Sequence, residues 1–102
     1  MEGKATQQQI DDWKAKYDEI YEAVSLINDK QHATYLRKPD LDVISAAAKY
    51  AESDPVKSGI IMLNSIRIGG SDAPMNNDEA KMGLMAYAGK LFKVIEAEGK
   101  KL

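Results

Sequence analysis

The chain lacks cysteine altogether, and its 102 residues include a single histidine, His32. Without cysteine there is no disulfide framework, no thiolate nucleophile and no cysteine-based zinc or iron–sulfur site. One histidine cannot make a histidine-rich metal centre, and no serine motif accompanies His32 that would make it part of a nucleophilic site. We therefore expect a protein that is not an enzyme and that needs no cofactor or metal.

Long hydrophobic runs and an excess of one charge are also missing. The longest apolar run, Gly59–Leu63, is too short to span a bilayer, and the polar N-terminus, Met1–Lys4, lacks the apolar core of a signal peptide. The 14 basic and 16 acidic residues give a net charge of -2 and are dispersed, which disfavours nucleic acid as a partner. These absences predict a soluble protein of the cytoplasm, without membrane or nucleic-acid partners.

The length and the pattern of the chain fit one α+β domain. We expect an N-terminal helix, a β-hairpin and then three helices, packed as a small single domain over residues 6–102. Residues 1–5 are expected to be a disordered lead-in. Thr6 predicts the start of the first helix, because it is a good N-cap and Gln9 stands at the capping-box position three residues later.

Two interpretations exist for the end of this first helix. Apolar residues keep a helical spacing up to residue 27, which favours one long helix, Gln7–Ile27. Against it, Asn28–Gln31 is typical of a turn, and His32–Arg37 has the composition of a strand, which needs a partner. We favour a β-hairpin in which Ile20–Ile27 pairs with His32–Arg37.

Three later helices are marked by their first residues. Asp40 predicts the N-cap of the second helix, and Asp54 followed by Pro55 predicts the start of the third. Asn76 or Asn77 is expected to cap the last helix. These three starts divide the second half of the chain into helices of ordinary length.

The ends of the last two helices are predicted from glycines and charges. Gly69–Gly70 should end the third helix in a turn, and the last helix should end before Lys100 and Lys101. Gly83 and Gly89 weaken that helix by about 1 kcal/mol each relative to alanine, which indicates close approach of another backbone or a need for mobility. The expected core stripe of the last helix is Leu84, Ala88, Leu91 and Ile95.

Five residues are candidates for binding a protein partner. Trp13 either anchors the first helix to the hairpin or serves as a partner-facing hot spot. Arg67 forms either a rim salt bridge or a contact with an acidic partner. Methionines near the last helix fill the core or provide an adaptable binding surface, with an aromatic residue at the edge of the stripe. The candidates are Trp13, Arg67, Met82, Met85 and Phe92.

Five segments between residues 7 and 70 form an ordered pattern: Gln9–Tyr17, Tyr35–Asp40, Ser45–Ala47, Asp54–Lys57 and Asn64–Gly70. This pattern resembles a family of small proteins of tailed bacteriophages and prophages, the tail assembly chaperone-like group. The family typically has glycine where Asp18 stands, and a larger aromatic or aliphatic residue is expected near Ile66–Arg67. None of the matching segments carries catalytic residues.

The resemblance implies a non-enzymatic role in the cytoplasm of a bacterial host. A protein of this group is expected to keep an aggregation-prone tail component soluble until assembly, either the long tape-measure protein or the tail-tube subunits. Such a role needs an adaptable apolar surface and reversible binding. The alternative is a small bacterial adaptor or regulatory protein-binding module with an unknown partner.

Overall fold

A three-stranded antiparallel sheet in the order β1-β2-β3 organises the protein. The computed structural model describes residues 1–92 and 94–102. A helix, a hairpin and further helices follow one another along the chain, which confirms the predicted α+β class. The elements are α1 (Gln7–Lys16), β1 (Ile20–Ile27), β2 (Lys30–Arg37), α2 (Leu41–Ala48), α3 (Pro55–Ile66), β3 (Arg67–Gly70), the short 3-10 helix η1 (Ala73–Asn76) and α4 (Asp78–Ala88).

The hairpin closes through a two-residue turn. Asn28 and Asp29 both have positive φ angles, 49° and 63°, which is the backbone of a turn whose twist matches the paired strands. Asn and Asp tolerate this conformation better than other non-glycine residues. The hairpin interpretation is confirmed. The alternative of one long helix, Gln7–Ile27, is wrong, because β1 is an extended strand that pairs with β2 from Ile27 opposite Lys30 to Ile20 opposite Arg37.

The strand β3 was not predicted. The Gly69–Gly70 pair, expected to end the third helix in a turn, instead lies beside β2, with Gly69 opposite Tyr35 and Gly70 opposite Thr34. Glycine is a poor strand former, so composition pointed away from a strand. Gly70 has a φ of 112°, and a Cβ there would lie only 2.8 Å from the Thr34 Cα. Close approach of two backbones explains the glycine.

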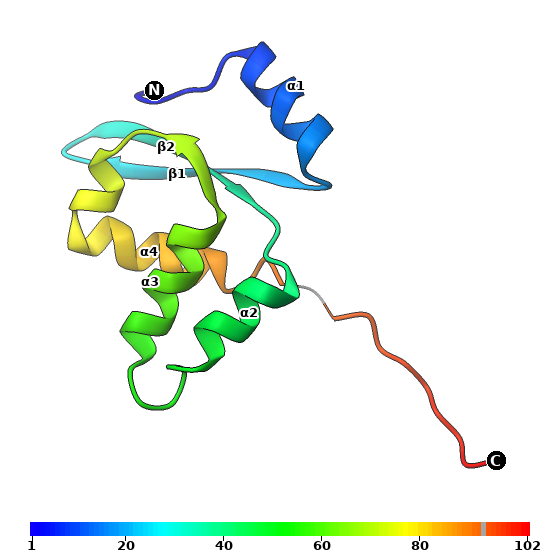
Figure 1. Ribbon diagram of the computed structural model, residues 1–102. Coiled ribbons are helices and arrows are strands. Elements are labelled where there is room, and N and C mark those ends of the chain that lie inside the picture. The colour runs from blue at the N-terminus through cyan, green and yellow to red at the C-terminus, as the bar shows by residue number, and fades with distance from the viewer. Residues whose placement is uncertain (93) are drawn as a thin grey trace.

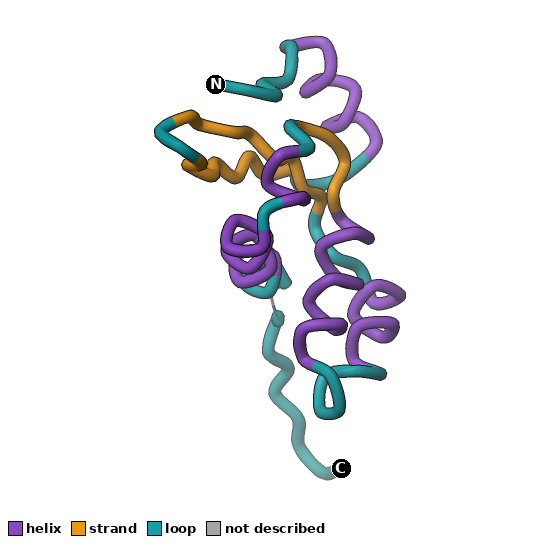
Figure 2. The backbone as a smooth tube through the Cα atoms, turned by 90° about the vertical axis from the view of Figure 1, so that its left-hand side faces the viewer, coloured by secondary structure: helices purple, strands orange, loops and turns teal. Residues whose placement is uncertain are grey.

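The sheet separates α1 from the other helices (Figure 1). The α1 helix lies on one face, while α3 and α4 cover the other and α2 packs against α3, as Figure 2 also shows. The core lies between the sheet and these three helices. It consists of Leu36, Val43, Leu63, Ile66, Leu84, Ala88 and Leu91.

The predicted helix starts are confirmed. Thr6 and Gln9 form the reciprocal capping box at α1. The carboxylates of Asp40 and Asp54 accept the N–H groups of the third helical residues of α2 and α3 at 3.0 and 3.1 Å. Asn77, the second of the two candidates, caps α4 by accepting the Ala80 N–H at 2.9 Å.

The expected end of the last helix is wrong. The α4 helix stops at Ala88, with Gly89 as its C-cap, and Lys100 and Lys101 lie in an extended segment far beyond it. Leu91 is buried as expected, but Ile95 is 95% exposed and belongs to no core. Gly89 ends the helix early because glycine favours a helix terminus over a helix interior.

The N-terminal residues lie along the sheet. Residues 1–5 were expected to be a disordered lead-in, and in the structure Glu2 pairs with His32 in a parallel bridge. The Glu2 N–H donates to the Gln31 carbonyl at 2.8 Å, and the Glu2 carbonyl accepts the Ala33 N–H at 2.9 Å. This segment therefore continues the sheet beyond β3 on the same side of β2.

The cap at α2 makes a prediction about acid stability. The Val43 N–H, and secondly the Arg37 guanidinium, lower the pKa of Asp40 below its ordinary value of 3.8. A carboxylate with a lowered folded pKa stabilises the protein above its unfolded pKa, and this contribution is lost as the pH falls through the folded value. Asp40→Asn keeps a capping oxygen and removes the titration. We expect this variant to lose less stability than the wild type between about pH 5 and pH 2, measured by urea unfolding; equal losses would contradict the assignment.

Candidate functional site

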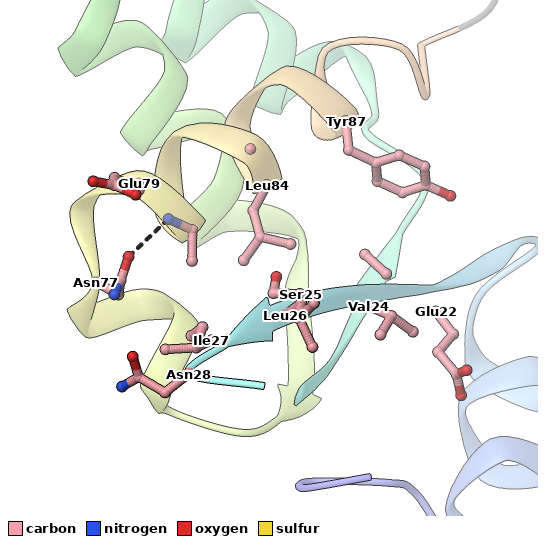
Figure 3. A pocket seen from close by; sticks show the side chains of 13 residues that line it. Glu22, Val24, Ser25, Leu26, Ile27, Asn28, Asn77, Glu79, Leu84 and Tyr87 are labelled. Atoms are coloured by element: carbon pink, nitrogen blue, oxygen red, sulfur yellow. Dashed lines mark hydrogen bonds between the residues drawn. The ribbon is translucent and has the colours of Figure 1, made fainter. Parts of the chain in front are cut away.

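A groove of about 650 Å³ runs between β1 and α4 (Figure 3). The strand supplies one wall and the helix supplies the other. Asn77 at the start of α4 lies near Ile27 and Asn28, whereas Tyr87 near the end of α4 lies toward the Glu22 end of β1. The groove therefore follows the length of an edge strand. Its lining consists of residues 22–28 of the strand and turn, and of Asn77, Glu79, Ala80, Gly83, Leu84 and Tyr87.

The strand beside the groove has a free edge. Within residues 1–92 and 94–102, β1 pairs with β2 only. Unpaired N–H and C=O groups along a strand edge are a template for pairing with another chain. The hydrogen bonds of β2 show which residues of β1 present such groups.

On β2, backbone groups of Gln31 and Ala33 point away from β1. The Gln31 carbonyl and the Ala33 N–H bond to Glu2, and the Ala33 carbonyl accepts the Ser71 N–H. Two residues paired in an antiparallel ladder direct their backbone N–H and C=O groups either toward each other or apart. Gln31 pairs with Leu26, and Ala33 pairs with Val24. Leu26 and Val24 therefore direct their backbone groups to the free edge of β1. The same alternation includes Glu22, so three consecutive outward positions of β1 remain unpaired.

Apolar and acidic side chains surround this edge. Val24 is 50% exposed and Leu26 is 70% exposed, on the sheet face that also carries Glu22, since Glu22 accepts a hydrogen bond of 2.6 Å from the Tyr35 hydroxyl. Among the lining residues, Glu22 and Glu79 are charged, and both are acidic. The site offers main-chain hydrogen bonds, two apolar contacts and two acidic side chains, of which Glu22 lies 3.9 Å from the Lys4 ammonium.

Gly83 leaves open space in the helical wall of the groove. A Cβ built at this position meets no heavy atom within 4 Å, although glycine inside a helix costs about 1 kcal/mol relative to alanine. Within the described residues, no backbone packs against Gly83 to explain that cost. Its effect is to widen the groove opposite β1.

Trp13 anchors α1 to the sheet. Its ring lies 5.1 Å from the ring of Tyr35, and a Cβ on Gly69 would come within 2.8 Å of the indole. The Tyr35 hydroxyl accepts the Ala5 N–H at 3.0 Å and donates to Glu22. Burial, followed by the hydrogen bond to Glu22, raises the pKa of Tyr35. Trp13 therefore lies outside the groove, and the anchor interpretation accounts for its contacts.

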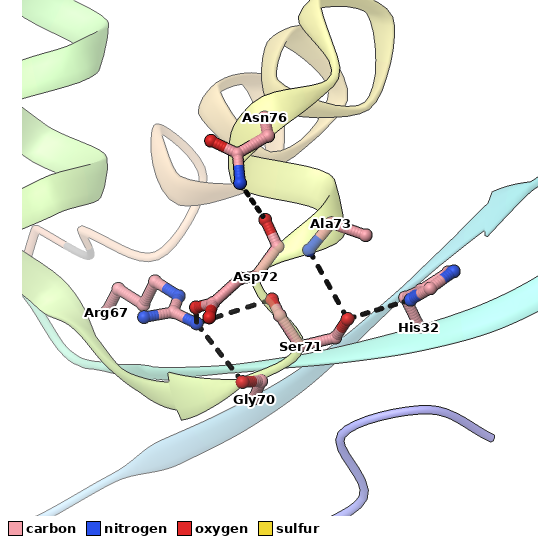
Figure 4. Close-up of polar contacts among 7 residues, drawn as sticks. All are labelled: His32, Arg67, Gly70, Ser71, Asp72, Ala73 and Asn76. Carbon is pink, nitrogen blue, oxygen red and sulfur yellow. Dashed lines mark hydrogen bonds and ion pairs between the residues drawn. The ribbon is translucent and has the colours of Figure 1, made fainter.

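Arg67 braces the turn after β3 (Figure 4). Its Nη2 contacts the Gly70 carbonyl at 3.2 Å, the Ser71 carbonyl at 3.3 Å and the Asp72 carboxylate at 3.2 Å. The Nε atom is buried without a hydrogen-bond partner among the described residues. These contacts hold the guanidinium in a local role, and the expected salt bridge is the one formed with Asp72.

The serine and histidine in the same view form a structural contact. His32 Nδ1 lies 2.8 Å from Ser71 Oγ, and this hydroxyl also accepts the Ala73 N–H at 3.4 Å. The Ser71 N–H bonds to β2, and a Cβ on Gly3 would collide with the Ser71 backbone. Neither side chain opens into the groove, so the pair serves to fasten the turn to the sheet.

The remaining candidates lie on or after α4 and do not form one site. Met85 packs against the core, directly over Gly59 of α3. Met82 is 53% exposed and Phe92 is 37% exposed, and neither lines the groove. The five predicted residues are thus divided between an anchor, a brace, a core contact and two exposed side chains.

Sequence reasoning missed the residues that do line the groove. Val24 and Leu26 lie within the predicted strand Ile20–Ile27, and their alternation with half-buried neighbours is the pattern of a strand with one exposed face. Gly83 was expected to mark either the close approach of another backbone or a need for mobility, and the structure shows no heavy atom within 4 Å of a Cβ built there.

Metal binding and membrane crossing each require a particular arrangement of residues. Among the described residues, no cluster of three or more His, Cys, Asp or Glu side chains is arranged to hold a metal ion. Over the same residues, none of the helices has the length and apolar character needed to cross a bilayer.

Comparison with known proteins identifies no relative. No protein-family model matches the chain, no curated protein is similar to it, and no solved structure matches its fold. The geometry of the groove and the sequence pattern are therefore the observations that bear on function.

Proposed function

We propose that this protein is a non-enzymatic binding module that holds an extended segment of another protein between β1 and α4. The observation that supports the proposal is the free edge of β1, unpaired at Glu22, Val24 and Leu26 and lying beside a groove. An extended segment that adds to such an edge gains main-chain hydrogen bonds, while neighbouring pockets select its side chains. Val24 and Leu26 favour a segment with apolar residues, and the two acidic side chains favour basic ones.

We further propose that the module is a phage tail assembly chaperone acting in the cytoplasm of a bacterial host. The ordered pattern from Gln9–Tyr17 to Asn64–Gly70 supports this role through its resemblance to that group. The client is then a tail component, the tape-measure protein or the tail-tube subunits. Reversible pairing at an exposed strand edge suits a chaperone, because it covers an apolar client segment without any covalent step.

The direct test is co-expression with the proposed client, a long tape-measure protein. Size-exclusion chromatography with light scattering should show a soluble complex, and the long protein should precipitate when this chain is omitted. If the long protein behaves identically with and without this chain, the chaperone proposal fails. A different partner recovered at the same groove would then support the adaptor interpretation.

Variants at Gly83 separate binding from folding. Gly83→Ala and Gly83→Leu both replace a helical glycine at a position with open space, so both should raise the free energy of unfolding by about 0.5–1 kcal/mol. Leucine also fills the groove. We expect Gly83→Leu to weaken client binding at least tenfold, about 1.4 kcal/mol, and Gly83→Ala to weaken it much less. Urea unfolding and titration calorimetry with the purified client provide the two measurements.

A second pair of variants tests the strand edge itself. Val24→Pro removes an N–H that points to the free edge of β1, and proline is tolerated where that N–H faces away from the ladder. Val24→Thr keeps the N–H and a β-branched side chain, and serves as its matched control. Client binding that survives both Val24→Pro and Gly83→Leu would show that the groove is not the binding site.

A further inference from the structure

The segment that follows α4 extends away from the domain. Residues 94–102 are exposed, and the apolar side chains of Val94, Ile95 and Leu102 are 75%, 95% and 106% exposed. Figures 1 and 2 show this segment projecting away from the sheet and helices. The radius of gyration is 15.5 Å, against about 13 Å for a compact chain of this length. These three apolar side chains therefore lie in water, with no partner surface among the described residues.

The dimensions of the segment match those of the groove. In an extended conformation, residues 94–102 span about 30 Å, and the eight residues of β1 span about 26 Å at roughly 3.3 Å per residue. If the segment runs antiparallel to β1 with Ile95 beside Leu26, then residue 97 lies beside Val24 and Gly99 lies beside Glu22. The exposed apolar side chains of Leu26 and Ile95 then lie together at the turn end of β1.

In the same register, the charges match at one end of the segment. Lys101 comes two residues after Gly99 and lies on the same face of the segment. It is therefore diagonally opposite Glu22, at a distance that a long side chain can reach. Lys100 adds a second positive charge at that end of the segment. The groove lining contains acidic but no basic residues, so Lys100 and Lys101 meet opposite charge at the Glu22 end, whereas Glu96 and Glu98 bring like charge to the middle of the groove.

The chain cannot make this antiparallel pairing with its own β1. Leu91 is buried in the core, after Tyr87, which lies toward the Glu22 end of the groove. Three residues from Leu91 to Val94 reach about 10 Å, well short of the roughly 26 Å length of β1. Its own segment could therefore enter only from the Glu22 end and run parallel to β1. Antiparallel pairing is the somewhat more stable arrangement.

We infer that residues 94–102 of a second copy of this chain add to β1 as an antiparallel strand and close the groove of the free protein. This inference rests on the proposed function, because it assigns a resident occupant to the same groove. The second copy occupies the site until a client segment replaces it. Reciprocal exchange between two copies gives a closed dimer with an isologous interface.

Cysteine cross-linking tests the pairing, because the natural chain has no cysteine. Two variants, Leu26→Cys and Ile95→Cys, are mixed under mild oxidation. Because Leu26 directs its backbone groups to the free edge, Ile95 opposite it would form a hydrogen-bonded antiparallel pair, whose Cα atoms lie about 5.5 Å apart, within the range of a disulfide. We expect a covalent dimer to form at least tenfold faster than in the control mixture of Ile95→Cys with Glu52→Cys, where Glu52 is exposed in the turn between α2 and α3. Equal rates would overturn the inference.

The double variant Leu26→Cys/Ile95→Cys distinguishes a second copy from the same copy. A disulfide that leaves the chain monomeric under denaturing, non-reducing conditions shows pairing within one chain and overturns the inference. A covalent dimer supports it. Ile95→Asp in the otherwise natural chain should shift the mass measured by light scattering from dimer to monomer; an unchanged dimer would also overturn it.

Client binding measured in parallel separates the two proposals. If no cross-link forms and Gly83→Leu still blocks client binding, the inference about residues 94–102 falls and the proposed function stands. If the cross-link forms and Gly83→Leu leaves client binding unchanged, the groove is a self-association site and the proposed function falls.

Discussion

Gly70→Val is expected to destabilise the protein by on the order of 3 kcal/mol. The φ of 112° at this position is accessible to glycine and costly for a β-branched residue. A Cβ would also collide with the Ala33 carbonyl oxygen and lie 2.8 Å from the Thr34 Cα. These atoms belong to the backbone of β2, so they cannot move aside without breaking the pairing with β3.

Urea unfolding measures the size of this effect, with Gly89→Ala as the control. Gly89 has a φ of -63°, and a Cβ there would make ordinary contacts of 3.6 and 3.7 Å with helix carbonyl oxygens. We expect the control to match or slightly exceed the wild type in stability. Equal stability of Gly70→Val and the wild type would mean that β3 does not pair with β2 as described.

Trp13→Ala is expected to release α1 from the sheet. The helix has 10 residues and none of them is fully buried, and an isolated helix of this length is marginal in water. Burying most of an indole, about 200 Å² of apolar surface, at about 25 cal/mol per Å² is worth on the order of 5 kcal/mol. Because the ring packs on Tyr35 and Gly69, its removal takes away the main contact that holds α1.

Hydrogen exchange measures this release residue by residue. Amides in residues 7–16 should lose protection in Trp13→Ala, while those of α3 keep theirs. Gly69→Val should reproduce the effect with the tryptophan still present, since its side chain occupies the place of the indole. If α1 stays protected in both variants, other contacts hold it and Trp13 becomes available as a partner-facing residue.

Local signals in the sequence predicted much of the fold. Thr6, Asp40, Asp54 and Asn77 each cap a helix as expected, because a cap depends on the chemistry of a few neighbouring residues. The hairpin was also predictable, since its turn and both strands lie within 18 consecutive residues, from Ile20 to Arg37.

Features that depend on distant parts of the chain were not predicted. The strand β3 forms because α3 ends beside β2 and so places two glycines at its edge. No local sequence pattern predicts that placement, since glycine is a poor strand former. Ile95 continues the helical spacing of α4, yet Gly89 ends the helix first. The groove itself combines β1 with a helix about 50 residues further along the chain, so its lining could not be read from sequence periodicity.

The sheet also imposes an order on the folding of a chain that emerges from its N-terminus. The hairpin is local and can form as soon as residue 37 is available, but the second edge of β2 waits for β3 at residues 67–70. During that interval both sides of the hairpin are open to other chains, whereas the finished domain leaves one side open. Slow synthesis between residues 37 and 70 would therefore favour mispairing at β2, on the side of the sheet away from the groove.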